Sequence, residues 1–240
     1  MAVYNGAAFL KAQVESILHQ LRSEDELIVV DDASHDNSMR ILQEMHDPRL
    51  QIHRNERNVG VLATFERALG LAGGEIVFLS DQDDVWLAAK VAKVLQVFIS
   101  DPRATMVVTD ALVIDEHGQT LSPSFFSLRG DFSPGFMRNF IKNRYVGCTL
   151  SFRRTMLRRF LPIPRDVPMH DVWFGLLNEI YGRTRYIDEP LIAYRRHRRN
   201  ASPSSHAGLI QMLVWRCRLA KNIIRRLAER AFQGESDLIA

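Results

Sequence analysis

The sequence predicts an α/β protein in which a mostly parallel sheet is flanked by helices and followed by a C-terminal amphipathic helix. Short, mostly apolar runs such as Leu27–Val30 and Glu75–Leu79 have the length and composition of buried strands. Longer segments between them carry apolar residues at every third or fourth position, which is the spacing of one helix face. Strands and helices in alternation are typical of βαβ units, whose parallel strands are covered on both faces.

The first half of the chain shows this alternation clearly. Helices are predicted over residues 7–21, 36–45, 61–71 and 87–99, and strands over residues 27–30, 50–53 and 75–79. The segment Asp36-Asn37-Ser38 supplies capping side chains for the second helix. Gly73-Gly74 ends the third helix, because glycine tolerates the backbone angles that follow a helix. Tyr4-Asn5-Gly6 marks the turn between a short first strand and the first helix.

The second half is less regular. Strands are predicted over residues 106–108, 112–114 and 148–152, helices over 136–142 and 171–181, and short edge strands over 186–187 and 191–194. Residues 122–134 are rich in Ser, Pro, Gly and Phe, so we expect a loop or flap there, lying over the ligand site that is described below. Pro190 separates the two edge strands, as is usual for proline in sheets.

The last segment, Gly208–Phe232, has helical periodicity and a strong basic bias. Its basic residues are Arg216, Arg218, Lys221, Arg225, Arg226 and Arg230, and its one acidic residue is Glu229. Such a helix can lie on an anionic membrane surface or a partner, or it can pack on its own domain with a solvated basic face. We therefore divide the chain into a main domain over residues 1–205 and a basic helical tail over residues 206–240.

Composition limits the class of protein. The 240 residues are 46% hydrophobic and 25% charged, as in folded soluble proteins. A net charge of +3 and an Arg-rich part without interleaved aromatic residues disfavour a nucleic-acid partner. Cys148 and Cys217 form no C-x-x-C motif, which disfavours a disulfide framework and a cysteine zinc site. The chain shows no signal peptide and no run of about 18 apolar residues, so a cytoplasmic protein is expected.

Three carboxylates follow the strand that ends at Leu79. Asp81, Asp83 and Asp84 are expected at the carboxyl end of that strand, where open α/β sheets bind ligands. Packed carboxylates repel one another unless a cation neutralises them, and oxygen ligands suit Mg²⁺ or Mn²⁺ with a phosphate in the coordination shell. The sequence thus predicts a site for a metal and a diphosphate. The alternative is a solvated loop that caps the next helix.

Two further polar segments have candidate roles. Asp31-Asp32 ends the second strand, where a carboxylate can accept hydrogen bonds from a base N–H or a ribose hydroxyl. Asp171 lies at the start of a helix, beside His170. An aspartate there can simply cap the helix, but it would also suit a general base.

With these segments in this order and spacing, residues 2–202 resemble the inverting family 2 glycosyltransferases, which have the Rossmann-like GT-A fold. More narrowly, they resemble the bacterial rhamnosyltransferase-like branch that builds surface polysaccharides. The segment Asn55–Gly60 is similar to the family's R-N-x-N-x-G loop, and Ser80–Trp86 to its D-x-D segment. His170-Asp171 matches its acidic catalytic motif, with His where many members have Glu. Tyr194–His197, followed by Asn200 and Ser202, matches the branch's Y-R-x-H…N-x-S ending.

The resemblance implies a role for each of these residues. It implies a metal ion, Mg²⁺ or Mn²⁺, held by Asp83 and Asp81, with Asp81 also facing the ribose or donor sugar. It implies that Asp171 is the general base that deprotonates the acceptor hydroxyl. The residues implied to bind the donor nucleotide or its diphosphate are Tyr4, Asn5, Asp31, Asp32, Asn58, Asp81, Asp84 and His197. The arginines beside His197 could add charge near the diphosphate, or form a solvated or membrane-facing patch.

The implied reaction is transfer of a sugar, such as rhamnose, from a nucleotide-diphosphate sugar to a glycan or lipid-linked acceptor by a single inverting displacement. Because transmembrane helices are lacking, unlike in processive members, one sugar per event is expected. Two other functions remain open. A nucleotidyltransferase would need a Gly-rich phosphate loop, which is lacking. A catalytically impaired nucleotide-sugar-binding subunit is favoured by the short first strand. The short strand has two explanations: either Met1 is an internal methionine of a longer natural chain, or the protein tolerates a shortened strand.

Overall fold

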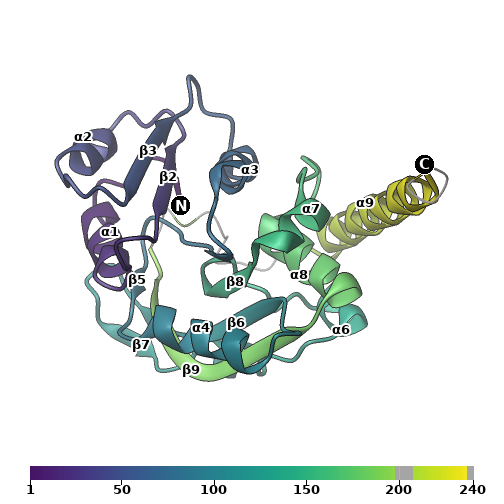
Figure 1. Ribbon diagram of the computed structural model, residues 1–240. Coiled ribbons are helices and arrows are strands. Elements are labelled where there is room, and N and C mark those ends of the chain that lie inside the picture. Colours follow the sequence, from purple (N-terminus) through teal and green to yellow (C-terminus); the bar gives the residue numbers. More distant parts are fainter. Residues whose placement is uncertain (198–199, 201–207, 237–240) are drawn as a thin grey trace.

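The computed structural model describes residues 1–197, 200 and 208–236. A small sheet and a larger sheet lie one above the other in Figure 1, with helices packed around both. Ser202 of the C-terminal motif and the expected domain boundary between residues 205 and 206 lie outside the described residues. Across the parts of the chain that are described, no helix is both long and apolar enough to cross a membrane.

The small sheet is the βαβ region that the sequence predicts. Its elements are β1 (Ala2–Val3), α1 (Leu10–Leu18), β2 (Leu27–Asp31), α2 (Ser38–Gln43), β3 (Leu50–Arg54) and α3 (Val61–Leu71). Both strand pairs, β1–β2 and β2–β3, are parallel. Helix α3 packs on the face of β2 that carries Ile28 and Val30. Val29, on the opposite face, joins the main core together with Leu10 and Val14 of α1.

Strand β1 is two residues long, as expected. It pairs with only the last two residues of β2, Val30 and Asp31. The Met1 amine donates a hydrogen bond to the carbonyl oxygen of Ile28 at 2.7 Å, and burial lowers the pKa of this amine to about 5. A cavity of about 630 Å³ lies beside Met1, between the first residues of β2 and β4.

The larger sheet is mixed, and this corrects the expectation of a mostly parallel sheet throughout. Its strands are β4 (Ile76–Phe78), β5 (Val85–Trp86), β6 (Met106–Ile114), β7 (Thr120–Ser122), β8 (Leu150–Arg153) and β9 (Thr184–Arg195). The order is β4-β8-β6-β9-β5, with β7 paired to β6. Among the described strands of this sheet, β6 and β9 are the one parallel pair, and the other pairs are antiparallel.

The two edge strands predicted near the C-terminus are one strand, and it is internal. Strand β9 is 12 residues long and lies between β6 and β5. Pro190 is opposite Asp110, at a register shift between β6 and β9. Proline has no N–H to donate, and an irregularity in the ladder is where a missing donor costs least. The strands predicted over 106–108 and 112–114 are likewise one strand, β6.

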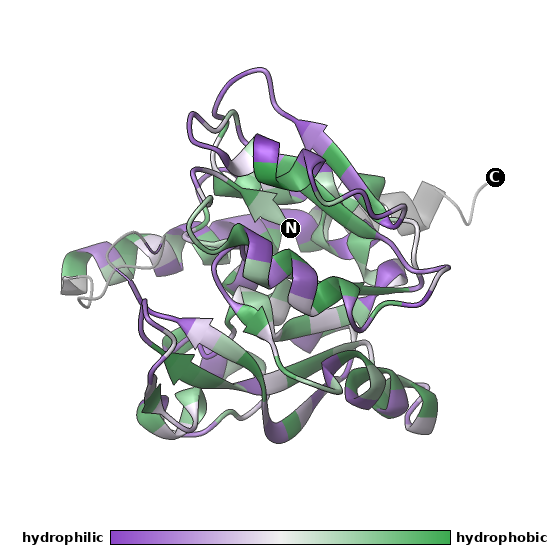
Figure 2. Ribbon diagram, turned by 90° about the vertical axis from the view of Figure 1, so that its left-hand side faces the viewer, coloured by the Kyte–Doolittle hydropathy of each residue, from purple (hydrophilic) through white to green (hydrophobic). Residues whose placement is uncertain are grey.

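Helices cover both faces of the larger sheet. The helices of this part of the chain are α4 (Lys90–Ser100), α5 (Phe125–Arg129), α6 (Phe136–Ile141), α7 (Leu157–Phe160), α8 (His170–Tyr181) and α9 (Leu209–Ser236), with 3₁₀ turns at Gly147–Thr149 and Arg154–Met156; of these, α9 does not cover the sheet. Val107 of β6 packs with Val94 and Phe98 of α4. Its neighbours Met106 and Val108 join the main core on the other face. Figure 2 shows hydrophobic and hydrophilic residues mixed along the strands and helices, and a strongly hydrophilic long loop at the top of the view.

Helix α9 extends away from the body but is attached to it at its middle (Figure 1). Leu219 and Ile223 are buried there. The guanidinium of Arg226 donates hydrogen bonds to the carbonyl oxygens of Arg159, Leu161 and Pro162 at 2.6–2.9 Å and lies 5.3 Å from the ring of Trp173. A second apolar stripe faces solvent, with Ile210 79% and Leu213 62% exposed.

Candidate active site

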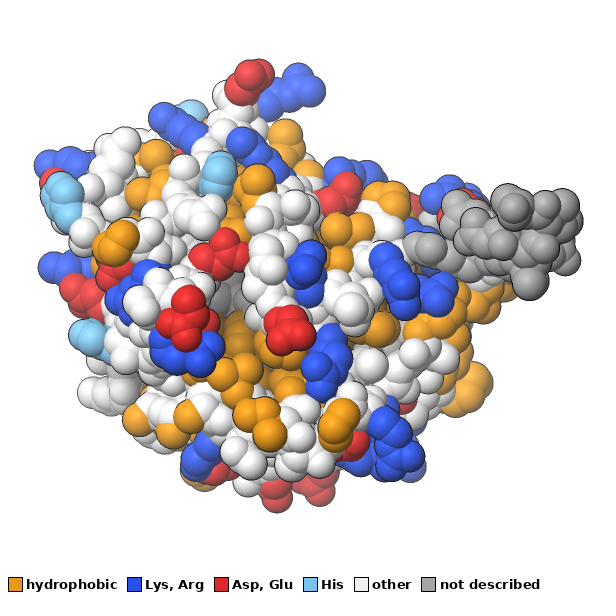
Figure 3. All heavy atoms as spheres, in the orientation of Figure 1, with side chains coloured by type: hydrophobic (Ala, Val, Ile, Leu, Met, Phe, Trp, Pro, Cys, Tyr) orange, Lys and Arg blue, Asp and Glu red, His pale blue; other side chains and the backbone are white. Residues whose placement is uncertain are grey.

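A cleft of about 340 Å³ opens between the two sheets. The loops after β1, β2 and β4 and the first turns of α3 and α8 contribute to its lining. Its lining includes Tyr4, Asp32, Asn58, Asp81, Asp83, Asp171 and Asn200. In Figure 3, acidic and basic side chains surround a hollow between the two sheets. Candidate residues from distant parts of the sequence therefore meet in one place.

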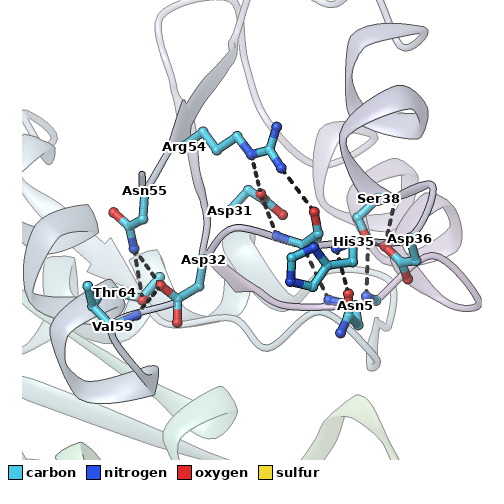
Figure 4. Close-up of polar contacts among 12 residues, drawn as sticks. Asn5, Asp31, Asp32, His35, Asp36, Ser38, Arg54, Asn55, Val59 and Thr64 are labelled. Carbon is cyan, nitrogen blue, oxygen red and sulfur yellow. Dashed lines mark hydrogen bonds and ion pairs between the residues drawn. The ribbon is translucent and has the colours of Figure 1, made fainter. Parts of the chain in front are cut away.

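Asp32 shapes one wall of the cleft by holding the loop that leads into α3. Its carboxylate accepts hydrogen bonds from Asn55 Nδ2 at 2.7 Å and from the N–H groups of Val59 and Gly60, each at 2.9 Å (Figure 4). Gly60 has a φ of 87°, which only glycine adopts at little cost. Asn58, between these anchors, is exposed on the cleft wall.

Asp31 and Asn5 support this wall but do not line the cleft. Asp31 is fully buried, accepts a hydrogen bond from the N–H of Ser34 at 3.0 Å and pairs with Arg54 at 3.3 Å (Figure 4). Asn5 donates its N–H to Ser34 Oγ and accepts one from the N–H of His35, both at 2.9 Å. Tyr4, in contrast, is 42% exposed and lines the cleft.

Gln82 connects the two sheets across the cleft floor. Its Oε1 accepts a hydrogen bond from the N–H of Tyr4 at 2.7 Å, and its Nε2 donates to the carbonyl oxygen of Tyr4 at 3.0 Å. A Cβ at Gly6 would lie 2.5 Å from this Oε1, so glycine is needed for the close approach. The residue stands inside the D-x-D segment, yet no sequence pattern predicts that it binds backbone rather than ligand.

Asp83 forms a pair with His197. Asp83 belongs to the acidic loop, residues 81–84, which follows β4. Asp83 Oδ2 lies 2.8 Å from His197 Nε2 and accepts a hydrogen bond from Asn200 Nδ2 at 3.2 Å. A carboxylate and an imidazole are suitable ligands for a divalent cation. The D-x-D segment and the Y-R-x-H ending therefore meet in the folded chain.

The ionised forms of Asp81 and Asp84 are disfavoured by their surroundings. Burial and the charges of Asp84, Asp83 and Asp171 raise the pKa of Asp81 well above its ordinary value. Burial and the charge of Asp83 raise the pKa of Asp84 to about 7. Oxygen atoms of Asp81 and Asp84 and the sulfur of Cys148 lie within 4.8 Å of one another. A cation would relieve this repulsion, so the residues fit the implied Mg²⁺ or Mn²⁺.

Asp84 itself lies behind the cleft floor, where Lys90 is its counter-charge. Asp84 is fully buried and accepts a hydrogen bond from the N–H of Arg195 at 3.0 Å. Lys90 is also fully buried, donates to the carbonyl oxygen of Cys148 at 3.2 Å and lies 5.0 Å from the ring of Trp86. Burial lowers the pKa of Lys90 to about 7. Helical periodicity does not mark this lysine as buried.

Arg195 is buried and holds together the loops around the site. It therefore does not belong to the solvated basic patch considered for the arginines beside His197. It is 7% exposed. Its Nε donates to the carbonyl oxygen of Asp83 at 2.9 Å, and its Nη1 donates to that of Asp115 at 3.1 Å. The guanidinium also lies 4.7 Å from the ring of Phe9. It therefore joins the acidic loop to the β6–β7 turn and to the start of α1.

Asp171 lies in the first turn of α8, facing the cleft. Burial raises the pKa of this carboxyl to about 7, although the N–H groups of Val172 and Gly147 and the charge of Arg129 oppose the shift. The Val172 N–H contacts Asp171 Oδ1 at 2.5 Å. A carboxyl that titrates near neutral pH can accept a proton from a hydroxyl and release it to solvent.

Comparison with known proteins shows the family of the chain. The model of the family "Glycosyl transferase family 2" matches residues 1–161, so the chain belongs to that family. It is 26% identical over 163 residues to the UDP-Glc:alpha-D-GlcNAc-diphosphoundecaprenol beta-1,3-glucosyltransferase WfgD of Escherichia coli, covering 67% of this chain and 61% of WfgD. It is 29% identical over 201 residues to TuaG of Bacillus subtilis, whose name assigns it provisionally to teichuronic acid biosynthesis, covering 80% of this chain and 75% of TuaG.

Solved structures share the fold. The 1-349 segment of S. aureus TarS in complex with UDP-GlcNAc superposes with a TM-score of 0.66 at 18% identity, covering 86% of this chain and 60% of that one. PcManGT, a mannosyltransferase from Pyrobaculum calidifontis in complex with GDP-Man and Mn²⁺, gives 0.60 at 22% identity, covering 96% and 62%. The fold is therefore GT-A, as predicted. The chain spans about three fifths of the length of several curated relatives.

Proposed function

We propose that this protein is a metal-dependent, inverting glycosyltransferase of bacterial surface polysaccharide synthesis. It would transfer a sugar from a nucleotide-diphosphate sugar to a hydroxyl of a glycan or lipid-linked acceptor. One observation carries the proposal: the Asp83–His197 pair and Asp171, whose pKa is about 7, line or border the same cleft. Family membership supports it, as do the names of WfgD and TuaG.

The donor nucleotide would lie along the part of the cleft that is lined by the loops after β1, β2 and β3. The exposed ring of Tyr4 can stack on a base, and Asp32 Oδ2, which accepts one backbone N–H, can accept a second hydrogen bond from the nucleoside. Asn58 can donate to the nucleotide from the opposite loop. We propose supporting roles for Asp31 and Asn5, because both are occupied in holding loops.

The diphosphate would face the acidic loop. Asp83 and Asp81 would hold the Mg²⁺ or Mn²⁺ ion, and His197 would contact the ion or the diphosphate. When bound, the ion neutralises charge on the leaving nucleoside diphosphate. Arg195 keeps the Asp83 carbonyl in place. Lys90 offsets the negative charge of Asp84 beneath the floor of the cleft. Neither reaches the cleft lining, so we assign both to positioning.

Asp171 would act as the general base. It takes the proton of the acceptor hydroxyl as that oxygen forms a bond to the anomeric carbon. The bond from the same carbon to the diphosphate oxygen breaks, and the nucleoside diphosphate leaves with the electron pair. A single displacement inverts the anomeric configuration. The charge of Arg129 lowers the pKa of Asp171 and so favours its ionised form.

The acceptor is proposed to be lipid-linked and reached at an anionic membrane surface on the cytoplasmic side. The solvent-facing stripe of α9, with Ile210 and Leu213, is flanked by exposed Arg218, Lys221 and Arg225. This pattern suits an interfacial helix. Leu213→Asp should weaken binding to vesicles containing anionic lipid but leave binding to neutral vesicles unchanged. Equal vesicle binding by both proteins would remove the membrane from the proposal.

The proposed function is tested by thermal unfolding with UDP, GDP and dTDP and with UDP-glucose, GDP-mannose and dTDP-rhamnose. The last follows from the resemblance to the rhamnosyltransferase-like branch. Each ligand is tested with Mn²⁺, Mg²⁺ or chelator. A ligand at about 100 times its Kd adds about 2.7 kcal/mol of stability. We expect a metal-dependent shift that Asp83→Ala abolishes and Asp171→Asn retains. No shift from any ligand would overturn the proposal, and binding without transfer would favour a nucleotide-sugar-binding subunit.

A further inference from the structure

Three polar side chains on one face of the first helix hold the segment that contains the acidic loop. Gln13 and Ser16 belong to α1, and Gln20 follows just after its end. Their spacing of three and four residues is that of one helix face. Each of them bonds the backbone of the segment over residues 80–91. The helix therefore supports the acidic loop from outside the cleft.

Gln13 contacts the acidic loop directly. Its side chain is fully buried and does not belong to the cleft lining. Its Nε2 donates hydrogen bonds to Ser80 Oγ at 2.8 Å and to the carbonyl oxygen of Asp81 at 2.9 Å. Ser80 Oγ also donates to that carbonyl oxygen, at 3.1 Å. The Asp81 carbonyl is therefore held by Gln13 and by Ser80.

The amide of Gln13 is hydrogen-bonded at both ends. While Nε2 donates to the loop, Oε1 accepts from Ser16 Oγ at 3.1 Å. Burying an amide costs free energy unless its donors and acceptor are paired, and an apolar side chain would fill the same position without that cost. The polar contacts of Gln13 therefore serve to fix the loop rather than to fill the core.

The acidic loop is held at a second point in the same way. Arg195 Nε donates to the carbonyl oxygen of Asp83 at 2.9 Å. Both proposed metal ligands, Asp81 and Asp83, thus have a backbone carbonyl fixed by a buried side chain. Because the peptide group is planar, a fixed carbonyl also fixes the N–H that follows it. Each carboxylate then keeps little freedom beyond its own side-chain torsions.

These restraints oppose the repulsion among the carboxylates. Oxygen atoms of Asp81 and Asp84 lie within 4.8 Å of each other. Like charges this close favour a wider loop when no cation is bound. A loop whose backbone is held keeps its ligand atoms together before the cation arrives, so binding has fewer groups to order.

We propose that Gln13 is a positioning residue for the metal site. By holding the Asp81 carbonyl, it keeps the carboxylates of Asp81 and Asp83 in place to bind one divalent cation. This inference rests on the proposed function and adds to it a residue outside the cleft lining on which metal affinity depends. Replacing a residue that orients metal ligands typically weakens metal binding by about 10–100-fold.

Gln20 offers a matched control, because it is the same residue type on the same helix face. Its Nε2 donates to the carbonyl oxygen of Leu87 at 3.0 Å, and its Oε1 accepts from the N–H of Val91 at 3.2 Å. These contacts hold the start of α4, beyond the acidic loop. Gln13→Met and Gln20→Met keep the length of the side chain and remove its amide. We expect both variants to lower the Tm.

The test measures how much Mn²⁺ each protein needs to bind a nucleotide. UDP, GDP and dTDP are titrated by calorimetry into the wild type with chelator and at increasing Mn²⁺ concentrations, and the nucleotide that binds is used for the variants. We expect Gln13→Met to raise the Mn²⁺ concentration for half-maximal binding about tenfold or more. Gln20→Met should leave that concentration within about twofold. Any nucleotide affinity that remains in chelator should be alike in all three proteins.

An unchanged Mn²⁺ requirement in Gln13→Met would overturn the inference and leave the proposed function intact. An equal rise in Gln20→Met would also overturn it, because lower stability would then be the cause. If no nucleotide shows metal-dependent binding to the wild type, the proposed function fails and this inference fails with it. If Gln13→Met does not fold, Ser80→Ala takes its place, since it removes the hydroxyl that Gln13 binds and that donates to the Asp81 carbonyl. An unchanged Mn²⁺ requirement in Ser80→Ala would again overturn the inference.

Discussion

The pH dependence of sugar transfer should follow the ionisation of Asp171. Burial raises the pKa of this carboxyl to about 7, and a general base works only when it is deprotonated. At pH 6, roughly a tenth of the molecules would carry the ionised base, and at pH 5 roughly a hundredth. We therefore expect kcat/KM to fall about tenfold per pH unit below 7 and to level off above about pH 8.

Two variants test whether Asp171, rather than another titrating group, sets the pH dependence of transfer. Arg129 lowers the pKa of Asp171, so Arg129→Gln should move the midpoint of the profile to higher pH. The change should shrink as salt is added, because Arg129 is exposed to solvent. Asp171→Asn should reduce transfer by about 10²–10⁴-fold and leave no pH-dependent step near 7.

The same pKa predicts an effect on stability with the opposite sign. The folded protein holds the Asp171 proton up to about pH 7, whereas the unfolded chain releases it near pH 3.8. Stability is therefore lost as pH rises between these values, by up to about 4 kcal/mol. Asp171→Asn avoids this cost, so it should be more stable than the wild type at pH 8 and similar at pH 4.

The pH dependence of kcat/KM is measured from initial rates at subsaturating donor, from pH 5 to 9 at two salt concentrations. The stability of the wild type and of Asp171→Asn is measured by urea unfolding at pH 4 and 8. A flat rate profile, or a midpoint that Arg129→Gln leaves in place, would refute the assignment of the base. A less stable Asp171→Asn protein at pH 8 would refute the argument from burial.

Three further outcomes are expected. Asp83→Asn should weaken metal-dependent donor binding at least about tenfold without lowering the Tm, and calorimetry that shows the same metal dependence as the wild type would reject this ligand. Gln82→Leu removes two hydrogen bonds to Tyr4 and should cost about 1–3 kcal/mol in urea unfolding and raise the donor KM. Arg226→Met should cost about 2–4 kcal/mol, because three carbonyl oxygens lose a charged donor; unchanged urea unfolding would show that these hydrogen bonds contribute nothing to stability.

Local patterns were sufficient to predict the first sheet and the position of the acidic loop. Helix α3 covers the predicted residues 61–71, because its apolar spacing and the following glycines are purely local signals. The second sheet needed more than local patterns. Residues 186–187 and 191–194 resemble two strands because Pro190 interrupts the run, but pairing with β6 on one side and β5 on the other makes them one internal strand.

The segments singled out in the sequence line one cleft, but the sequence does not show which of two neighbouring residues reaches it. Asp31 and Asp32 are adjacent, and only the alternation along β2 decides that Asp32 reaches the cleft and Asp31 does not. Lys90 looks like an ordinary polar helix residue, because its burial comes from packing against Trp86 and the loop at Cys148. Such long-range contacts leave no periodic pattern in the sequence.

The internal position of β9 has a consequence for synthesis of the protein in the cell. The ribosome releases the acidic loop early, but Arg195, which holds the Asp83 carbonyl, follows 112 residues later. At about 5–20 residues per second, β5 and β6 must wait several seconds for the strand that lies between them. During that time, both strands present unpaired edges that favour aggregation. Fragments that end before Thr184 would contain every carboxylate of the site and still be unable to complete the sheet that supports them.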